Sequence, residues 1–337
     1  MEFDKILLSP GSGGRLSQRL IQDVFLKELG NEILDELNDS AVLEVAGGRL
    51  AYTTDAYVVS PIFFPGGDIG RLSVCGTVND LSMMGAMPLY LSASFIIEEG
   101  LGIDELKVIS RSMKQAADEA GVKIVCGDTK VVGKGMADRI FITTSGIGLI
   151  PEGTDISPRR ICPGDSVIIS GTIGDHGIAI LSQREGLEFS SNLISDVAPL
   201  NHLVASMLDE AGNDIHALRD PTRGGLATTL NEFASKSGFL IRVYEDKISI
   251  QDNVRGVCEL LGLDPLYIAN EGKLVAIVRN EAKDRVLACM KKHPLGINAA
   301  IIGEVVEKPE GMVCLLTRIG GMRVVDMLTG EQLPRIC

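Results

Sequence analysis

The 337-residue sequence lacks the features that mark membrane, secreted and nucleic-acid-binding proteins. It has no run of about 18 or more apolar residues, and its start lacks the basic-then-apolar pattern of a signal peptide. Its 32 Lys and Arg residues against 45 Asp and Glu give a formal net charge of −13, which argues against nucleic acid and anionic membranes as partners. We therefore expect a soluble, cytoplasmic protein.

Cysteine pairs and metal-ligand clusters are also lacking. None of the 7 cysteines belongs to a C-x-x-C pair or to a Cys/His cluster at zinc spacing, and the 4 histidines show no mutual spacing of a ligand set. We interpret six cysteines as small buried residues in a reducing compartment. The seventh, Cys337, is the last residue of the chain.

Short apolar runs, Gly/Asp turns and helical patterns alternate along the chain, which predicts an α/β or α+β fold. At about 100–200 residues per domain, the length predicts two domains. A stretch rich in Pro, Gly, Asp and Arg, 151–163, is the expected boundary. We expect four segments: 1–36 with a glycine loop and a helix, 37–150, 151–310, and 311–337 with a closing hairpin and a tail.

Periodicity predicts the elements within these segments. Strands are expected at 41–45, 49–53, 89–97, 123–126, 139–147, 166–170, 240–243, 274–278, 300–306, 312–317 and 322–327. Helices are expected at 16–29, 74–84, 104–120, 175–183, 200–211, 224–236, 254–261 and 281–292.

Five aspartates lie at predicted strand ends or beside turns: Asp39, Asp55, Asp80, Asp128 and Asp220. Any one of them is more often a turn former or helix cap than a ligand. Asp80, next to Asn79 in an otherwise apolar stretch, needs a partner because burying an ionised group is costly. Several converging carboxylates would repel unless a cation joined them, and Mg²⁺ prefers such oxygen ligands.

A glycine-rich loop, Gly11-Ser12-Gly13-Gly14, precedes the first predicted helix. Free backbone N–H groups at such a helix start can bind an anion. The loop matches neither G-x-x-x-x-G-K-[ST] nor a G-x-G-x-x-G after a strand, and a plain N-terminal loop is an equal alternative. Gly224-Gly225 opens another helix in the same way. Both loops together with the aspartates favour an ATP–Mg²⁺ site of a non-standard type.

Three more residues are candidates for chemistry. Lys130, just after the predicted strand 123–126, either lies on the surface or binds phosphate or takes a proton. Glu271 precedes a strand and is either a turn residue or part of a site. Cys337 ends a tail with little to pack, and the seven residues from Glu331 span about 23–25 Å when extended. Such a tail can carry a group between sites, and an incidental terminal thiol is the alternative. Arg335 would favour the thiolate, whereas the adjacent terminal carboxylate works against it.

Taken together, the motifs resemble those of the HypE family, the carbamoyl dehydratases of NiFe-hydrogenase maturation. The resemblance covers essentially the whole chain. The acidic motifs alone indicate the wider superfamily of aminoimidazole ribonucleotide synthetase, selenophosphate synthetase and thiamine monophosphate kinase, and the Pro-Arg-Ile-Cys end makes the match specific. The matching motifs are Gly11–Gly14, Asn38–Ala41, Thr53–Asp55, Val78–Ala86, Gly127-Asp128-Thr129-Lys130, Arg219–Gly225, Asn270-Glu271-Gly272 and Pro334–Cys337.

The resemblance implies a two-domain aminoimidazole ribonucleotide synthetase-like fold with a flexible C-terminal tail. It implies ATP and Mg²⁺, a homodimer whose N-terminal domains pair, and the carbamoyltransferase HypF as the source of a carbamoyl group on Cys337. The chain would dehydrate this S-carboxamide to a thiocyanate and pass the nitrile to iron on a HypC–HypD complex. Catalytic roles would fall to Cys337, Lys130 and Glu271. The nucleotide would contact Gly11, Ser12, Gly13, Gly14, Asp55, Asn79, Asp80, Asp128, Thr129, Asp220, Gly224 and Gly225, and the metal Asp39, Asp55, Asp80, Asp128 and Asp220.

Two other functions are compatible with parts of the sequence. A superfamily enzyme that phosphorylates a free small molecule would share the aspartates and glycine loops but would leave the terminal cysteine unexplained. A non-enzymatic carrier with a thiol tail would need no ATP site, so the aspartates and glycine loops count against it.

Overall fold

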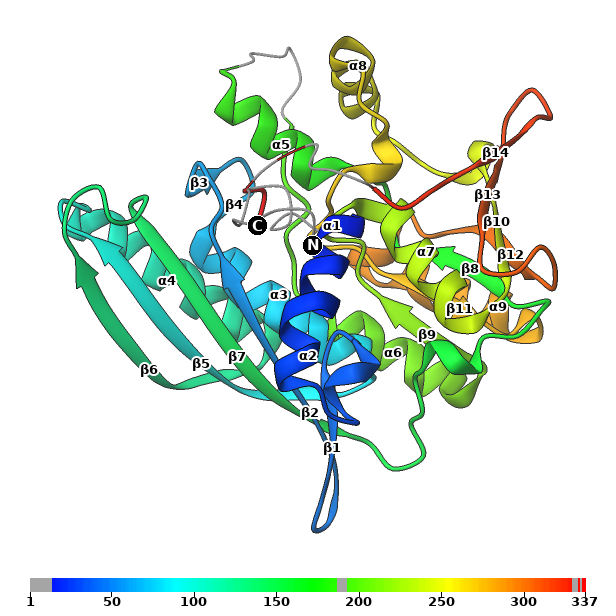
Figure 1. Cartoon of the computed structure of the whole chain (residues 1–337), viewed down its shortest axis with the longest axis horizontal. Coiled ribbons are helices and arrows are strands. Elements are labelled where there is room, and N and C mark those ends of the chain that lie inside the picture. The colour runs from blue at the N-terminus through cyan, green and yellow to red at the C-terminus, as the bar shows by residue number, and fades with distance from the viewer. Residues whose placement is uncertain (1–13, 187–192, 329–332, 334) are drawn as a thin grey trace.

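The computed structural model describes residues 14–186, 193–328, 333 and 335–337. Two mixed β-sheets lie side by side, each with helices packed on it (Figure 1). This arrangement confirms the predicted α/β fold. Within the described ranges, no helix combines the length and hydropathy that crossing a membrane requires.

The first sheet has the strand order β1-β2-β7-β5-β6, with β5 and β6 parallel and the other neighbours antiparallel. Its strands are β1 Ala41–Val45, β2 Gly48–Tyr57, β5 Met87–Glu98, β6 Lys123–Val132 and β7 Ile140–Ile150. A short hairpin, β3 Phe63–Phe64 with β4 Gly67–Asp68, precedes the first helix of this half.

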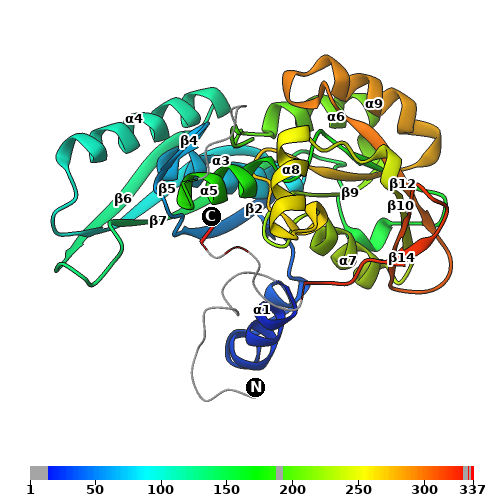
Figure 2. The ribbon, with the colours of Figure 1, turned by 90° about the horizontal axis from the view of Figure 1, so that it is seen from above.

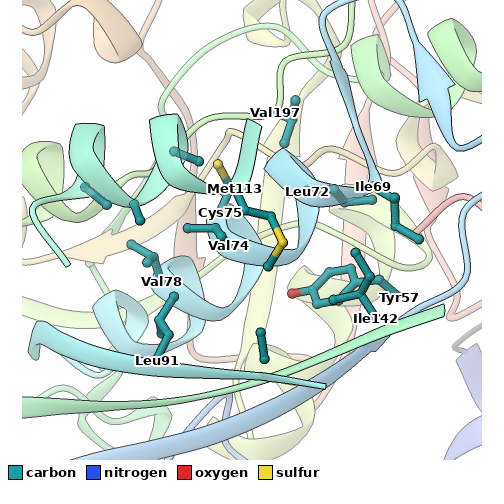
Figure 3. Close-up of a cluster of buried hydrophobic side chains, with 14 of the residues drawn as sticks. Tyr57, Ile69, Leu72, Val74, Cys75, Val78, Leu91, Met113, Ile142 and Val197 are labelled. Carbon is teal, nitrogen blue, oxygen red and sulfur yellow. The ribbon is translucent and has the colours of Figure 1, made fainter. Parts of the chain in front are cut away.

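Two helices, α3 Ile69–Met83 and α4 Ile103–Ala120, cover one face of this sheet (Figure 2). Helix α3 begins five residues earlier than predicted because the Asp68 carboxylate accepts hydrogen bonds from the N–H groups of Gly70 and Arg71, at 2.7 and 3.0 Å. Almost all of α3 is buried, so its side chains form the centre of the core in Figure 3.

Among the described residues, no helix packs over the centre of the other face of the first sheet. Register places the even-numbered residues of β2, β5 and β6 on this face, together with the odd-numbered residues of β7. Tyr52, Tyr90, Ile96 and Leu149 are exposed there. We call this surface the open face.

The second sheet has the order β14-β13-β10-β12-β8-β11-β9, with β10 and β13 parallel. Its strands are β8 Ser166–Ile169, β9 Ile215–Arg219, β10 Leu240–Tyr244, β11 Val275–Val278, β12 Ala300–Val306, β13 Val313–Leu316 and β14 Met322–Val324. The helices of this half are α5 Asp175–Arg184, α6 Asn201–Ala211, α7 Gly225–Ser237, α8 Asp252–Leu261 and α9 Lys283–Lys292.

Helices cover both faces of this second sheet. In β8, Val167 and Ile169 pack in the cluster that includes α7, whereas Ile168 packs in the cluster that includes α6 and α9. Burial on both faces makes the central strands β8 and β11 nearly continuous apolar runs, which is why they were recognisable in the sequence. The strand β9 is one that the sequence analysis missed.

The first described segment is α1 Gly14–Leu20, a π-helical turn Ile21–Phe25 and α2 Leu26–Leu29, which confirms the predicted helix 16–29. This segment lies in front of the junction between the two sheets (Figures 1 and 2).

Candidate functional site

A cleft of about 280 Å³ lies between the two halves, and both halves supply its walls. The first half contributes α1, the loop before β1, β2 and α3. The second half contributes the loop after β9, the start of α7 and the loop before β11. The lining includes Gly14, Asp39, Thr54, Asp55, Ala56, Asp80, Asp220, Thr222, Arg223, Glu271 and Cys337.

Three aspartates form the polar centre of this cleft, and we call them the acidic triad. One carboxylate oxygen from each of Asp39, Asp80 and Asp220 lies within 4.8 Å of the other two. Asp39 precedes β1, Asp80 is in the last turn of α3, and Asp220 follows β9. The Thr53 hydroxyl, 2.9 Å from Asp80 Oδ2, holds one of them in place. The predicted convergence of carboxylates is therefore present for these three.

The electrostatics of the triad call for a positive charge. Burial, and then the charges of Asp55, Asp220 and Asp39, hold the pKa of Asp80 well above its usual range. Burial and the charge of Asp39 raise the pKa of Asp220 to about 8. Burial also raises the pKa of Asp39, against the opposing charge of Arg219, whose Nη2 is 3.1 Å from Asp39 Oδ1. This donor set suits a hard divalent cation such as Mg²⁺.

Asp55 also lines the cleft but is not part of the triad. The Tyr57 hydroxyl donates a hydrogen bond to Asp55 Oδ2 at 3.0 Å. Burial and the Asp55 charge raise the pKa of Tyr57 well above its usual value, so the tyrosine stays a donor at neutral pH.

Glu271 is a buried acid in the cleft wall. Its side chain Oε1 has no hydrogen-bond partner among the described residues. Burial and the Asp220 charge hold its pKa well above the usual range. Its backbone is fixed on both sides, because its N–H donates to Asp196 Oδ1 at 3.0 Å and its C=O accepts from Asn79 Nδ2 at 3.3 Å.

Asn79 joins the two halves. Its Nδ2 also donates to the Ala198 C=O at 3.1 Å, and its Oδ1 accepts from the Leu200 N–H at 2.8 Å. Asn79 is not among the described residues that line the cleft. The structure therefore places this predicted nucleotide contact behind the wall, where it positions Glu271.

Cys337 lies in the same cleft. The preceding Ile336 is 5% exposed, so the expectation that the tail has little to pack is wrong for this residue, which joins the core of the first half. Burial, opposed by the charge of Arg223, raises the pKa of the Cys337 thiol to about 12. Arg335 instead donates to the Val58 C=O and pairs with Asp138.

Arg223 is therefore the cation next to Cys337, and the sequence analysis missed it. Its signal was present, because Arg223 belongs to the motif Arg219–Gly225 that also supplies Asp220. Position alone did not distinguish its role from that of Arg219, the other arginine of the motif.

Asp128, Thr129 and Lys130 lie away from the cleft of this chain. They are exposed residues within β6, and Lys130 Nζ is 3.2 Å from Asp128 Oδ2. The prediction that the strand ends at Cys126 is wrong, since pairing with β5 continues to Val132. Gly127 lies within this strand, and only glycine fits there because a Cβ would lie 2.5 Å from the Ala93 carbonyl oxygen.

The two glycine loops have different positions. Gly14 lines the cleft, whereas Gly11, Ser12 and Gly13 lie outside the described residues. Gly224 and Gly225 have φ values of +75° and +59° and shape the turn into α7. They are not among the described cleft-lining residues, but the adjacent Thr222 and Arg223 are.

Comparisons with known proteins agree with this architecture. Family models described as AIR synthase related protein, N-terminal domain and C-terminal domain, match residues 37–150 and 162–314. The carbamoyl dehydratase HypE of Bradyrhizobium diazoefficiens is 55% identical over 98% of this chain and 95% of its own. The Escherichia coli K12 HypE is 47% identical over 99% of this chain and 100% of its own.

Solved structures give the same result. A HypE–HypF complex has a chain with a TM-score of 0.88 and 50% identity, covering 92% of this chain and 99% of that chain. A HypE solved in complex with ATP has a TM-score of 0.83 and 53% identity, covering 99% of this chain and 100% of that chain. The chain thus belongs to the HypE family of carbamoyl dehydratases, which are enzymes of hydrogenase maturation.

Proposed function

We propose that this chain dehydrates a carbamoyl group carried on its own Cys337, forming a thiocyanate that supplies a cyanide ligand for the NiFe-hydrogenase iron centre. The supporting observation is that Cys337 lines the same cleft as the acidic triad and Glu271. A terminal thiol in this position is a carrier presented to the site, and its high pKa makes it a poor attacking nucleophile while docked.

ATP is the proposed co-substrate, as the solved relative with ATP suggests. In the reaction, the carboxamide oxygen attacks the terminal phosphoryl group and ADP leaves. The C–O bond then breaks with loss of phosphate, two protons leave the nitrogen, and the C≡N bond forms. Phosphorylation is needed because hydroxide is a poor leaving group and phosphate a good one.

Asp39, Asp80 and Asp220 would hold Mg²⁺, with Asp55 beside them, and Gly14 would lie at the nucleotide. The ion, when bound, would neutralise charge on the transferring phosphoryl group. The raised pKa values of the triad fit this role, because a cation relieves the mutual repulsion that raises them.

We assign Glu271 as the base that removes a proton from the carboxamide nitrogen. Its unpartnered buried oxygen and raised pKa give it a strong affinity for a proton. Arg223 would orient the carbamoylated sulfur by its charge, and Asn79 would keep Glu271 in place.

A homodimer formed through the open face would bring Lys130 and Asp128 to a site. Both side chains share that face with Ser94 and Ile96. Thr54 and Ala56, which point to the same face, line the cleft. We therefore assign Asp128 and Lys130 to the cleft of the other protomer, whereas the Thr129 side chain lies on the opposite face of β6 together with Phe95. In the cytoplasm, HypF would load Cys337, and a HypC–HypD complex would receive the nitrile.

Mass spectrometry of the C-terminal peptide tests this function. The protein is incubated with HypF, carbamoyl phosphate and ATP–Mg²⁺, then cut before Asp326 to release 326–337. The expected product is a carboxamide on Cys337 that loses one water when hydrolysable ATP is present. A non-hydrolysable ATP analogue is the matched control and should stop the reaction at the carboxamide.

A Cys337→Ala variant gives the second arm. It should bind ATP and fold as the parent does, yet form no nitrile. Modification of another residue, or water loss that does not depend on ATP, would contradict the proposal.

A further inference from the structure

A buried histidine outside the reacting groups holds the tail in the cleft. His176, in the first turn of α5, is fully buried, and its Nε2 is 2.9 Å from the Ile336 carbonyl oxygen. A carbonyl only accepts hydrogen bonds, so Nε2 must carry a proton.

The rest of the ring is also held. His176 Nδ1 is 2.8 Å from the Ser195 hydroxyl oxygen, which itself accepts a hydrogen bond from the Val197 N–H at 3.1 Å. In a neutral ring with its proton on Nε2, Nδ1 is an acceptor, so the Ser195 hydroxyl donates to it. Burial lowers the pKa of His176, which agrees with this form. Phe64 packs edge-on against the ring at 5.6 Å between centroids.

Backbone contacts complete the binding site of the tail, which we call the seat and which is formed by His176, Arg184, Val58 and Ser60. The N–H groups of Val58 and Ser60 donate to the carbonyls of Cys337 and Arg335, at 3.1 and 3.2 Å, as in a short antiparallel pair. Arg184 Nη2, also from α5, donates to the Arg335 carbonyl at 2.8 Å. The seat thus binds the tail through the backbone oxygens of Arg335, Ile336 and Cys337 and through the buried Ile336 side chain.

We propose that His176, with its tautomer fixed by Ser195, is a positioning residue that latches the tail and sets the place of the Cys337 sulfur. This inference rests on the proposed dehydration at Cys337. A latch that buries the thiol protects it, so the tail must leave the seat to be loaded and return to be dehydrated. Weakening the latch should therefore speed reactions of the free thiol and slow the dehydration step.

The test measures both reactions in the full chain. Iodoacetamide labelling of the 326–337 peptide reports thiol exposure without ATP or partner, and single-turnover water loss from the carbamoylated protein reports dehydration. We expect His176→Leu to raise the labelling rate of Cys337 about tenfold and to slow water loss by a similar factor, as the loss of a buried hydrogen bond implies. His176→Gln, which keeps a donor near Nε2, should recover both rates towards the parent values.

Two further variants protect the test against misfolding. Ile336→Ala removes the buried side chain that anchors the tail, so it should also speed the labelling of Cys337 and slow water loss. His202→Leu removes another histidine, whose Nε2 is 3.0 Å from the Glu119 carbonyl, and should change neither rate. Unchanged labelling in both His176→Leu and Ile336→Ala would overturn the latch. Faster labelling with unchanged water loss would overturn the positioning role. If the parent itself loses no water, the proposed function fails, while the labelling rates still decide whether the latch exists.

Discussion

The two sheets differ in how much of their surface the chain itself covers. In the second sheet, Val167, Ile168 and Ile169 are all 0% exposed, because helices cover both faces. In the first sheet, helices cover one face, and the open face leaves Tyr90 and Ile96 45% and 44% exposed. The second half completes its own core, whereas the first half presents a surface suited to another molecule.

The same contrast divides the predicted site residues. Asp39, Asp80, Asp220 and Glu271 converge in the cleft where the halves meet, and Asp128 and Lys130 lie on the open face. A site built from both groups requires a second chain. The four predictions below test this division, in order of decreasing effect.

Removing one charge of the triad should have the largest effect. We expect Asp80→Asn to lower ATP-dependent nitrile formation about 100–1000-fold, because charge stabilisation at the phosphoryl group is lost. The folded state should keep its melting temperature or gain, since a buried charge among like charges is removed. Asp155→Asn, at an exposed ion pair with Arg160, is the matched control. Activity like that of the parent in Asp80→Asn would show that the acidic triad does not take part in the reaction.

Placing a charge on the open face should break the proposed dimer. Ile96→Asp should weaken self-association about thirtyfold, as loss of a buried interface anchor does. Sedimentation velocity over a concentration series measures this change. Ile319→Asp, at a 96% exposed position of the second half, should leave association unchanged. Equal behaviour of the two variants would show that the open face is not the dimer contact.

Metal binding at the junction should depend on pH. The pKa of Asp220 is raised to about 8, so below that pH the metal-free carboxyl carries a proton that Mg²⁺ must displace. Affinity should therefore rise by up to about tenfold per pH unit towards pH 8 and level off above it. Calorimetric titration of Mg²⁺ with a non-hydrolysable ATP analogue checks this slope, and Asp220→Asn should flatten it. A parent titration with no slope would contradict the assignment of Asp220 to the metal.

Dimers formed by mixing two inactive variants should show the smallest change in activity, and they test directly whether Lys130 serves the partner's site. Lys130→Ala and Glu271→Gln should each be inactive alone, yet mixing equal amounts should restore about a quarter of parental activity. Half of the dimers are then mixed, and each has one intact site if Lys130 serves its partner. No recovery after mixing would mean that Lys130 and Glu271 act within one chain. Parental activity of Lys130→Ala alone would mean that Lys130 plays no part.

Most elements could be predicted because their patterns are local. The strand Ala300–Val306 and the helix ending before Gly121 follow from apolar periodicity and a left-handed glycine stop. The strand Ile215–Arg219 was missed because a histidine interrupts its apolar run, and that histidine is buried against Asp165, 2.7 Å away. The end of β6 was misplaced because Gly127 suggests a turn, while its actual role is a close approach to β5.

The sequence alone determined the fold class, the five candidate aspartates and the terminal cysteine, because each depends on residue type and spacing along the chain. Only the tertiary structure decided which aspartates meet, that Arg223 faces Cys337, and that His176 holds the tail. These depend on how two halves far apart in sequence pack against each other. The same packing explains why the chain needs few basic residues. In the cleft, Arg219 and Arg223 partly neutralise the buried acids, and the three aspartates are placed to hold a cation, so no basic patch is required.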